Sequence, residues 1–153
     1  MNKIRILIVD DHAIVRTGLA ALLGSIPDFE IVGEASNGSI AVSKAIKLNP
    51  DVIVMDLVMP KMGGVEATTE ILSKLPDTRI LILTSFGTSE ELSHVFSAGA
   101  TGAILKNTAN AALVSSIRRI AKGNRVVSPV IENMLANEPP IPELSSRQRD
   151  ILE

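Results

Sequence analysis

The sequence contains no cysteine, tyrosine or tryptophan, and it has no excess of basic residues. Without cysteine the chain can form no disulfide, offer no thiolate nucleophile and hold no cysteine-ligated zinc, which is consistent with a reducing cytosol. Its net charge of −2 gives no general attraction to a phosphate backbone, so the bulk composition does not favour nucleic-acid binding. The absence of a GxGxxG or P-loop pattern removes the main sequence support for nucleotide binding.

Long apolar runs are also absent. The longest are only a few residues, too short to cross a bilayer, and the first is cut off by two aspartates, unlike the apolar core of a signal peptide. We therefore expect a cytoplasmic protein with no membrane partner.

Five short apolar runs rich in Ile, Val and Leu lie at residues 4–9, 29–32, 52–55, 79–83 and 103–105. Continuous runs of this length predict strands that are covered on both faces. Between them lie stretches with helical spacing; in the first of these, Val15, Leu19 and Leu22 fall on one face. Glycines stand where such helices would stop, at Gly24, Gly99 and Gly123. Strand and helix alternate to about residue 122, which predicts an α/β fold with a parallel sheet and helices on both faces.

The pattern changes after Gly123. Residues 124–143 hold one possible short helix, at 129–135, and then three prolines that resist both helix and sheet. Residues 144–153, "LSSRQRDILE", begin a new helical pattern that has nothing to pack against. We expect a first domain at 1–123, a linker at 124–143 and the start of a truncated second domain at 144–153.

Polar side chains follow four of the five predicted strands. Asp10 and Asp11 follow the first, Asp56 the third, Thr84 the fourth and Lys106 the fifth. The carboxyl ends of parallel strands meet at one edge of a sheet, where the ligand crevice of such folds lies. An acidic pair after a strand is by itself often a helix cap. Five polar residues at four strand ends on one edge favour a functional site instead.

Three converging carboxylates would repel one another and shift each other's pKa unless a cation relieved the strain. Mg²⁺ suits such a site, because it binds one or two carboxylates and keeps coordination positions for a phosphate. A lysine ammonium and a threonine hydroxyl can hold phosphoryl oxygens. The set predicts a carboxylate that attacks phosphorus while metal, ammonium and hydroxyl neutralise the transferred group.

The segments "ILIVDDH", "VIVMDLVMPKMGGVEA", "ILTS" and "GAILK" resemble the receiver domain of two-component response regulators, over about residues 3–123. "DDHAIVRTGL" and "LSSRQRDILE" narrow the resemblance to the subfamily with a LuxR-type helix-turn-helix output domain, like the nitrate/nitrite regulators. This resemblance implies a flavodoxin-like sheet of five parallel strands in the order 2-1-3-4-5. It also implies that the output domain is truncated at 144–153.

The resemblance implies a role for each residue at the predicted edge. Asp56 would accept a phosphoryl group from a sensor histidine kinase. Thr84 and Lys106 would contact the phosphoryl oxygens. Mg²⁺ would be held by Asp11 and Asp56 directly, by Asp10 through water, and by the backbone carbonyl of Val58. In the loop after Asp56, Pro60 would stiffen the turn and Gly64 would allow backbone angles that larger residues resist.

The implied function is a bacterial signalling switch and not a turnover enzyme. Its chemistry would be limited to Mg²⁺-dependent self-phosphorylation and slow dephosphorylation. The implied partners are the cognate kinase, a second copy of the chain after phosphorylation, and DNA through the output domain only.

One position departs from the family pattern. Three residues before the lysine, where the family commonly carries an aromatic ring that moves inward on activation, this chain has Ala103. The absence of Tyr and Trp and the presence of only three Phe agree with the loss of that ring. The phosphorylation chemistry is unaffected, but the signal would have to leave the site by backbone movement or through other side chains.

Two other functions remain open from the sequence. A Mg²⁺-dependent phosphohydrolase would also use an aspartate at a sheet edge, although that class usually has a second aspartate where Val58 stands. A receiver-like domain that takes no phosphate would act only through protein contacts. Of the other polar residues, His12 is expected to be exposed at a helix start, and the basic residues near 118–125 to complement a helix dipole.

Overall fold

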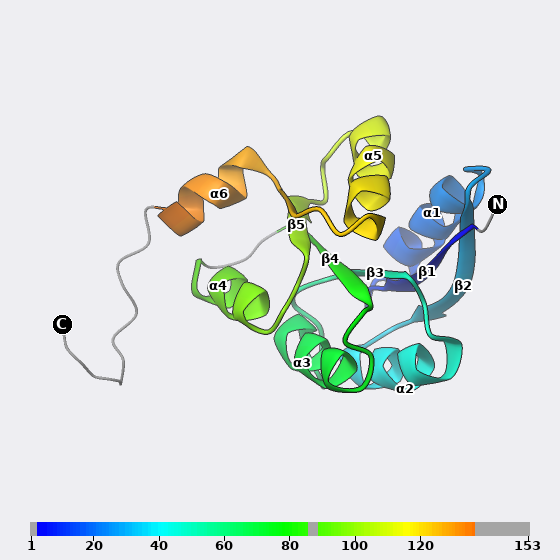
Figure 1. The fold of residues 1–153 in the computed structure, drawn as a ribbon, viewed down its shortest axis with the longest axis horizontal. Coiled ribbons are helices and arrows are strands. Elements are labelled where there is room, and N and C mark those ends of the chain that lie inside the picture. Colours follow the sequence, from blue (N-terminus) through cyan, green and yellow to red (C-terminus); the bar gives the residue numbers. More distant parts are fainter. Residues whose placement is uncertain (1–2, 86–88, 137–153) are drawn as a thin grey trace.

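The computed structural model of the chain describes residues 3–85 and 89–136. These residues form one parallel sheet of six strands in the order β2-β1-β3-β4-β5-β6 (Figure 1). The strands are β1 (Ile4–Val9), β2 (Phe29–Ala35), β3 (Val52–Met55), β4 (Arg79–Thr84), β5 (Gly102–Leu105) and β6 (Val126–Val127). The helices are α1 (Ala13–Gly24), α2 (Gly38–Leu48), α3 (Gly64–Lys74), α4 (Ser89–Ser97), α5 (Asn110–Ala121) and α6 (Pro129–Ala136).

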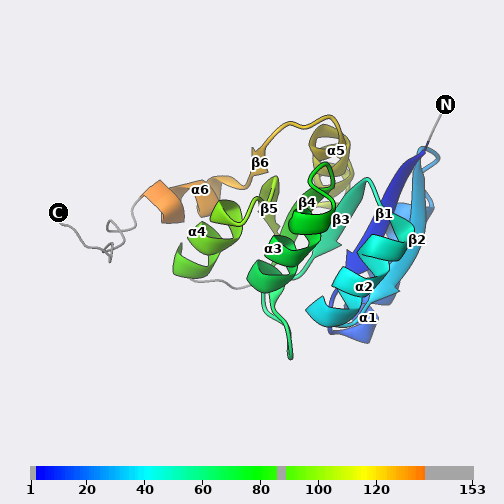
Figure 2. The same ribbon diagram turned by 60° about the horizontal axis from the view of Figure 1, so that its bottom comes forward.

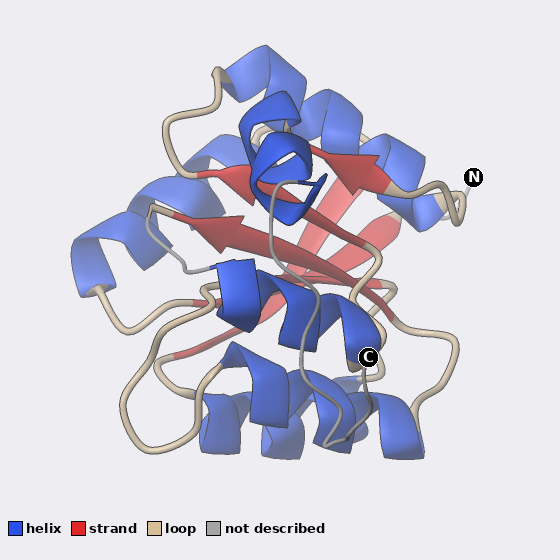
Figure 3. Cartoon of the chain, turned by 90° about the vertical axis from the view of Figure 1, so that its left-hand side faces the viewer, coloured by secondary structure: helices blue, strands red, loops and turns tan. Residues whose placement is uncertain are grey.

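The sheet is covered on both faces, which explains why its strands are continuously apolar. Successive side chains of a strand point to opposite faces. In β1, Ile6 and Ile8 accordingly pack in the core under α1 and α5, whereas Leu7 and Val9 pack in the core under α2, α3 and α4. Figure 2 shows α2, α3 and α4 side by side on one face, and Figure 3 shows the sheet between its two helical layers. The predicted α/β class and the order of the first five strands are confirmed.

The prediction of five strands is corrected by the sixth strand, β6, which pairs with β5 through Gly102 and Val126 and through Ala103 and Val127. Only two residues long, this strand leaves no periodic signal in the sequence. This strand can pair with β5 only because residue 102 is a glycine. A Cβ at this position would overlap the Val126 carbonyl oxygen.

The short helix that the sequence indicated at 129–135 is present as α6, and it packs against α4. Ile131 of α6 is fully buried in the core cluster beneath α2, α3 and α4. The Arg125 guanidinium adds an ion pair to Glu132 of 3.1 Å and lies 4.8 Å from the ring centroid of Phe96 on α4. Residues 124–136 are therefore folded onto the domain, while the predicted output-domain start at 144–153 lies outside the described residues.

Two of the three predicted helix-ending glycines adopt left-handed backbone angles. Gly99, after α4, has φ 114° and Gly123, after α5, has φ 90°, a region that side chains with a Cβ resist. Within the described part of the chain, no helix is both long and apolar enough to span a membrane.

Replacing Ile131 by Ala should lower the free energy of unfolding by about 2 to 5 kcal/mol, because the change leaves a cavity beneath a fully buried side chain. Val130→Ala is the matched control, since Val130 is 54% exposed on the same helix and its truncation should cost no more than about 0.5 kcal/mol. Urea unfolding of both variants measures the difference. Equal stabilities for the two variants would show that α6 does not belong to the cooperative unit.

Candidate functional site

An acidic cluster of Asp10, Asp11 and Asp56 forms at the carboxyl edge of the sheet. Asp10 follows β1 and Asp56 follows β3, and the Asp56 N–H donates to the Val9 carbonyl at 3.0 Å, which sets the two strand ends side by side. One ligand atom from each of the three carboxylates, together with one from His12, lies within 4.8 Å of the others. The sheet therefore brings together the three carboxylates that the sequence placed at this edge.

Lys106 joins this cluster from the end of β5. Its ammonium lies 2.9 Å from Asp10 Oδ2 and 3.2 Å from Asp56 Oδ2. The Lys106 backbone N–H donates to the Thr84 carbonyl at 2.8 Å, so the pairing of β4 with β5 fixes where the side chain begins. A single ammonium thus bridges carboxylates that come from two other strands.

Burial and the contacts within this ion pair shift the pKa of both partners. It raises the pKa of the Asp56 carboxyl above its ordinary 3.8, because desolvation outweighs the opposing effects of the Lys106 charge and hydrogen bond. Burial by itself lowers the pKa of Lys106, but the hydrogen bond to Asp10 and the interactions with Asp56 raise it above 10.5. Lys106 therefore stays charged at neutral pH and partly neutralises a site that still holds an excess of carboxylates.

His12 occupies the mouth of the cluster. Its Nδ1 lies 3.2 Å from both Asp10 Oδ1 and Asp11 Oδ1, and hydrogen-bond geometry is met only with Asp10. Asp11 Oδ1 is consequently a buried oxygen without a hydrogen-bond partner within the described part of the chain. An orphaned carboxylate oxygen among other carboxylates is the donor set that a hard divalent cation prefers. The residues present fit such a cation.

The expectation that His12 is simply exposed was incomplete. Its side chain is 66% exposed, yet it contacts the site. The helix-cap interpretation of the acidic pair is wrong, because α1 has His12 at its N-cap position and no side-chain cap. Asp10 Oδ1 instead accepts the His12 N–H at 2.8 Å, which forms a local turn before the helix.

The β3–α3 loop, residues 57–63, begins directly after Asp56 and contains Val58. The Val58 backbone N–H favours the charged form of the Asp56 carboxyl and so opposes the rise of that pKa, and the Val58 side chain is exposed. The loop turns at Lys61, which has φ 68°, and the Met62 N–H donates to the Pro60 carbonyl at 2.8 Å. This three-residue turn is of a strained kind.

Gly64 is required in this loop for a different reason from the one expected. Its φ is not in the left-handed region. An added Cβ would instead lie 2.9 Å from the Asp56 carbonyl oxygen and 3.0 Å from the Leu57 Cα. The Gly64 N–H donates to the Leu57 carbonyl at 2.8 Å, which brings the start of α3 close to the end of β3. This close approach leaves no room for a side chain at residue 64.

Thr84 and Ala103 lie on β4 and β5, the paired strands that end near Lys106. Thr84 is buried at the end of β4, opposite Leu105 of β5. Ala103 is fully buried in the same core cluster as Ile131 of α6, and its backbone pairs with Ile82 and Val127. The position where the family carries a ring is therefore part of a closed core.

Arg16 is a contributor that the sequence analysis missed. Its Nη1 donates to the Asp10 carbonyl at 2.7 Å, and its Nε lies 3.3 Å from Glu34 Oε1 on β2. The side chain thereby ties the turn that carries the carboxylates to the neighbouring strand. In the sequence, the only indication of this role is an arginine in the first helical turn after the acidic pair. The same pattern is equally typical of an exposed surface residue.

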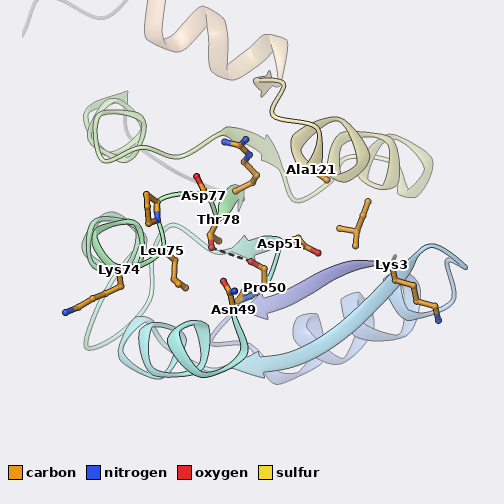
Figure 4. A pocket seen from close by; sticks show the side chains of 12 residues that line it. Lys3, Asn49, Pro50, Asp51, Lys74, Leu75, Asp77, Thr78 and Ala121 are labelled. Carbon is orange, nitrogen blue, oxygen red and sulfur yellow. Dashed lines mark hydrogen bonds between the residues drawn. The ribbon is translucent and has the colours of Figure 1, made fainter. Parts of the chain in front are cut away.

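A depression of about 640 Å³ lies at the opposite edge of the sheet, away from the carboxylates (Figure 4). Two of its polar side chains are engaged with the chain itself. The Asp51 carboxylate accepts the Arg5 N–H at 2.9 Å, and the Thr78 hydroxyl donates to the Pro50 carbonyl at 3.4 Å. The depression lies at the amino ends of the strands and lacks a cluster of carboxylates with a lysine, so the acidic cluster is the better candidate.

A flavodoxin-like sheet with carboxylates and a lysine at its carboxyl edge defines a receiver-type signalling domain. Residues 6–118 match the model of the response regulator receiver domain, and the chain belongs to this family. It is 45% identical over 135 residues to the transcriptional regulatory protein LiaR of Bacillus subtilis (strain 168). That alignment covers 88% of this chain and 62% of LiaR, so the chain spans less than two thirds of this relative.

Solved structures agree with this membership. A LuxR-family two-component response regulator from Aurantimonas is 38% identical, with a TM-score of 0.82, and the match covers 88% of this chain and 96% of that one. The receiver domain of the response regulator NarL from Mycobacterium tuberculosis is 30% identical, with a TM-score of 0.77 and coverage of 81% and 100%. The chain is thus a receiver domain of the kind found in LuxR-family regulators.

Replacing Asp56 by Asn should stabilise the metal-free protein at neutral pH. A carboxyl whose folded-state pKa is raised contributes stability below its unfolded pKa, and that stability is lost as the pH rises through the folded pKa. The asparagine does not titrate, so its advantage over the wild type should grow as the pH rises above 3.8 and then level off. Urea unfolding of both proteins in chelator across this pH range measures it. A stability difference that does not vary with pH would contradict the burial argument.

Proposed function

We propose that Asp56 is the phosphoacceptor of this receiver domain and that a sensor histidine kinase supplies the phosphoryl group. One observation carries the proposal. The Asp56 side chain is 8% exposed, has the Lys106 ammonium at 3.2 Å, and lies in a cluster with Asp10 and Asp11. The ammonium next to this carboxylate can neutralise the charge of phosphoryl oxygens when a phosphoryl group is transferred to it.

In the proposed step, a carboxylate oxygen of Asp56 attacks the phosphorus of a phosphohistidine. The new O–P bond of an aspartyl phosphate forms as the N–P bond breaks, and the departing imidazole takes a proton from solvent. Lys106 would move from its bond with Asp56 to a phosphoryl oxygen, and the Thr84 hydroxyl would donate to another. Both are charge-assisted hydrogen bonds, which are stronger than neutral ones.

The carboxylates would also hold Mg²⁺, with Asp11 and Asp56 as direct ligands, Asp10 acting through water and the Val58 carbonyl completing the protein ligands. The support for this is the orphaned Asp11 Oδ1 oxygen, which gains a partner when a cation enters the cluster. The bound cation would offset the charge of the phosphoryl oxygens during transfer.

In the whole protein, phosphorylation would control a LuxR-type DNA-binding output domain. The protein would bind DNA only through that domain, whose first residues would be 144–153. Its own catalytic contribution would be confined to Mg²⁺-dependent self-phosphorylation and slow dephosphorylation.

Phosphorylation would also promote self-association, through α1 and α5. Ile14 on α1 is 88% exposed. It borders a hollow of about 260 Å³ lined by Val15, Leu19 and Leu113 and reaching Lys106, so this face connects an apolar surface with the site. The face of α4 and β5 is already covered in part by α6 and β6.

Incubation with acetyl phosphate and Mg²⁺ should add the mass of one phosphoryl group to the wild type and none to Asp56→Asn. In this reaction the carboxylate displaces acetate at phosphorus. Intact-mass measurement on both proteins tests the assignment. An adduct of equal yield in the variant would remove Asp56 as the acceptor.

Beryllium fluoride with Mg²⁺ should shift the wild type to a higher mass, because this pair mimics the phosphorylated carboxylate. Ile14→Glu should abolish the shift, since it places a charge in the apolar contact. The control Val130→Glu changes another exposed apolar residue, on α6, and should associate normally. Light scattering measures the mass, and loss of association only in the α6 variant would place the interface on the other face.

A further inference from the structure

We infer that Gly38, the first residue of α2, is a positioning residue for the β3–α3 loop, and that its lack of a side chain sets the affinity of the acidic cluster for Mg²⁺. The inference rests on the proposed function of that cluster and assigns a role to a residue outside it.

The contact between Gly38 and the loop is a backbone hydrogen bond. The Gly38 N–H donates to the Met62 carbonyl at 3.0 Å. Amides in the first turn of a helix have no partner within the helix, so this donor is free to bind a neighbouring segment. Among the backbone hydrogen bonds of the described residues, this one ties loop 57–63 to an element other than β3 and α3.

The bond is possible only because residue 38 is a glycine. An added Cβ would lie 2.9 Å from both the carbonyl carbon and the Cβ of Met62, and closer still to the carbonyl oxygen. These are backbone atoms and a Cβ, which cannot rotate out of the way as the end of a side chain can. A methyl group at this position must therefore move either α2 or the loop.

The loop is the part that would yield. Helix α2 is anchored by Ala41 and Ala45, which are fully buried, and by the Asn37 side chain, which accepts the Ile40 N–H at 2.9 Å. The loop is exposed at Val58, Pro60 and Lys61, and it already contains the strained turn at Lys61.

Displacement of the loop reaches the site through Val58. Val58 stands in this loop two residues after Asp56, and its carbonyl is the proposed backbone ligand of the metal. Loss of a group that orients a metal ligand typically lowers metal affinity by 10- to 100-fold. Because the Gly38 contact acts from one step further away, we expect a loss of roughly tenfold.

The test compares three variants of the full chain. Gly38→Ala introduces the clash with Met62. Asn37→Ala weakens the start of the same helix by removing its cap and leaves the space at residue 38 unchanged. Gly18→Ala adds a methyl group to α1, where nothing lies within 4 Å of it.

Three measurements are made on each protein. Calorimetric titration with Mg²⁺ gives the affinity, thermal unfolding in chelator gives the stability, and hydrogen exchange in chelator reports on loop 57–63. We expect Gly38→Ala to bind Mg²⁺ roughly tenfold more weakly and to exchange faster in the loop. The two control variants should bind Mg²⁺ and exchange in the loop as the wild type does, although Asn37→Ala loses stability.

The outcomes separate this inference from the proposed function. Wild-type affinity and loop exchange in Gly38→Ala would overturn the inference, as would an equal loss of affinity in Asn37→Ala, which would reduce the effect to helix stability. If the wild type bound no Mg²⁺, the proposed metal site would fail. The metal-free exchange of the loop would then decide the role of Gly38, with faster exchange in Gly38→Ala alone supporting the tether.

Discussion

The ammonium of Lys106, 2.9 Å from Asp10 and 3.2 Å from Asp56, is the interaction on which the site depends. It allows the ends of β1 and β3 to hold carboxylates next to each other in a largely buried position. Removing the ammonium would leave the buried charges of Asp10 and Asp56 uncompensated, which costs more than the pair contributes. The sheet supplies the geometry, because the pairing of β4 with β5 brings Lys106 to this edge.

The same interaction leaves the cluster incompletely neutralised. Three carboxylates face a single ammonium, and Asp11 Oδ1 has no hydrogen-bond partner within the described residues. The domain therefore holds its binding residues in an arrangement that is unfavourable until a cation arrives. Such an arrangement persists only when its surroundings fix it, and here hydrogen bonds from Arg16, Gly64 and Gly38 hold the backbone near the carboxylates.

Most of the fold was predictable because its signals are local. Each of the first five strands is an uninterrupted apolar run, and parallel strands between helices leave few possible topologies. Strand β6 was not predictable, since Val126 and Val127 form a strand only because Gly102 leaves room for them. That condition joins residues 24 positions apart and has no counterpart in the periodicity.

Some residues of the site were predictable from the sequence and others were not, for the same reason. Asp10, Asp11, Asp56, Thr84 and Lys106 were predictable as polar residues at strand ends, because the sheet rule converts sequence position into place. The role of Gly64 was misjudged, since its sequence shows a glycine in a loop and not the backbone that passes 2.9 Å from its missing Cβ. Gly38 and Arg16 act through backbone carbonyls, and no residue type in the sequence marks a carbonyl as a partner.

Strand β5 connects the site to the end of the described chain, because it ends next to Lys106 and pairs with β6. Ser128 lies between β6 and α6; its N–H donates to the Ala103 carbonyl at 3.0 Å, and its hydroxyl accepts the Leu105 N–H at 3.4 Å. Leu105 directly precedes Lys106, so a shift of β5 that accompanies a change at the lysine acts on Ser128 through hydrogen bonds. An aromatic ring at residue 103 is not needed for this coupling, because the contacts are made by the backbone. The small side chain of Ala103 is therefore compatible with a signal that leaves the site along β5 and enters α6.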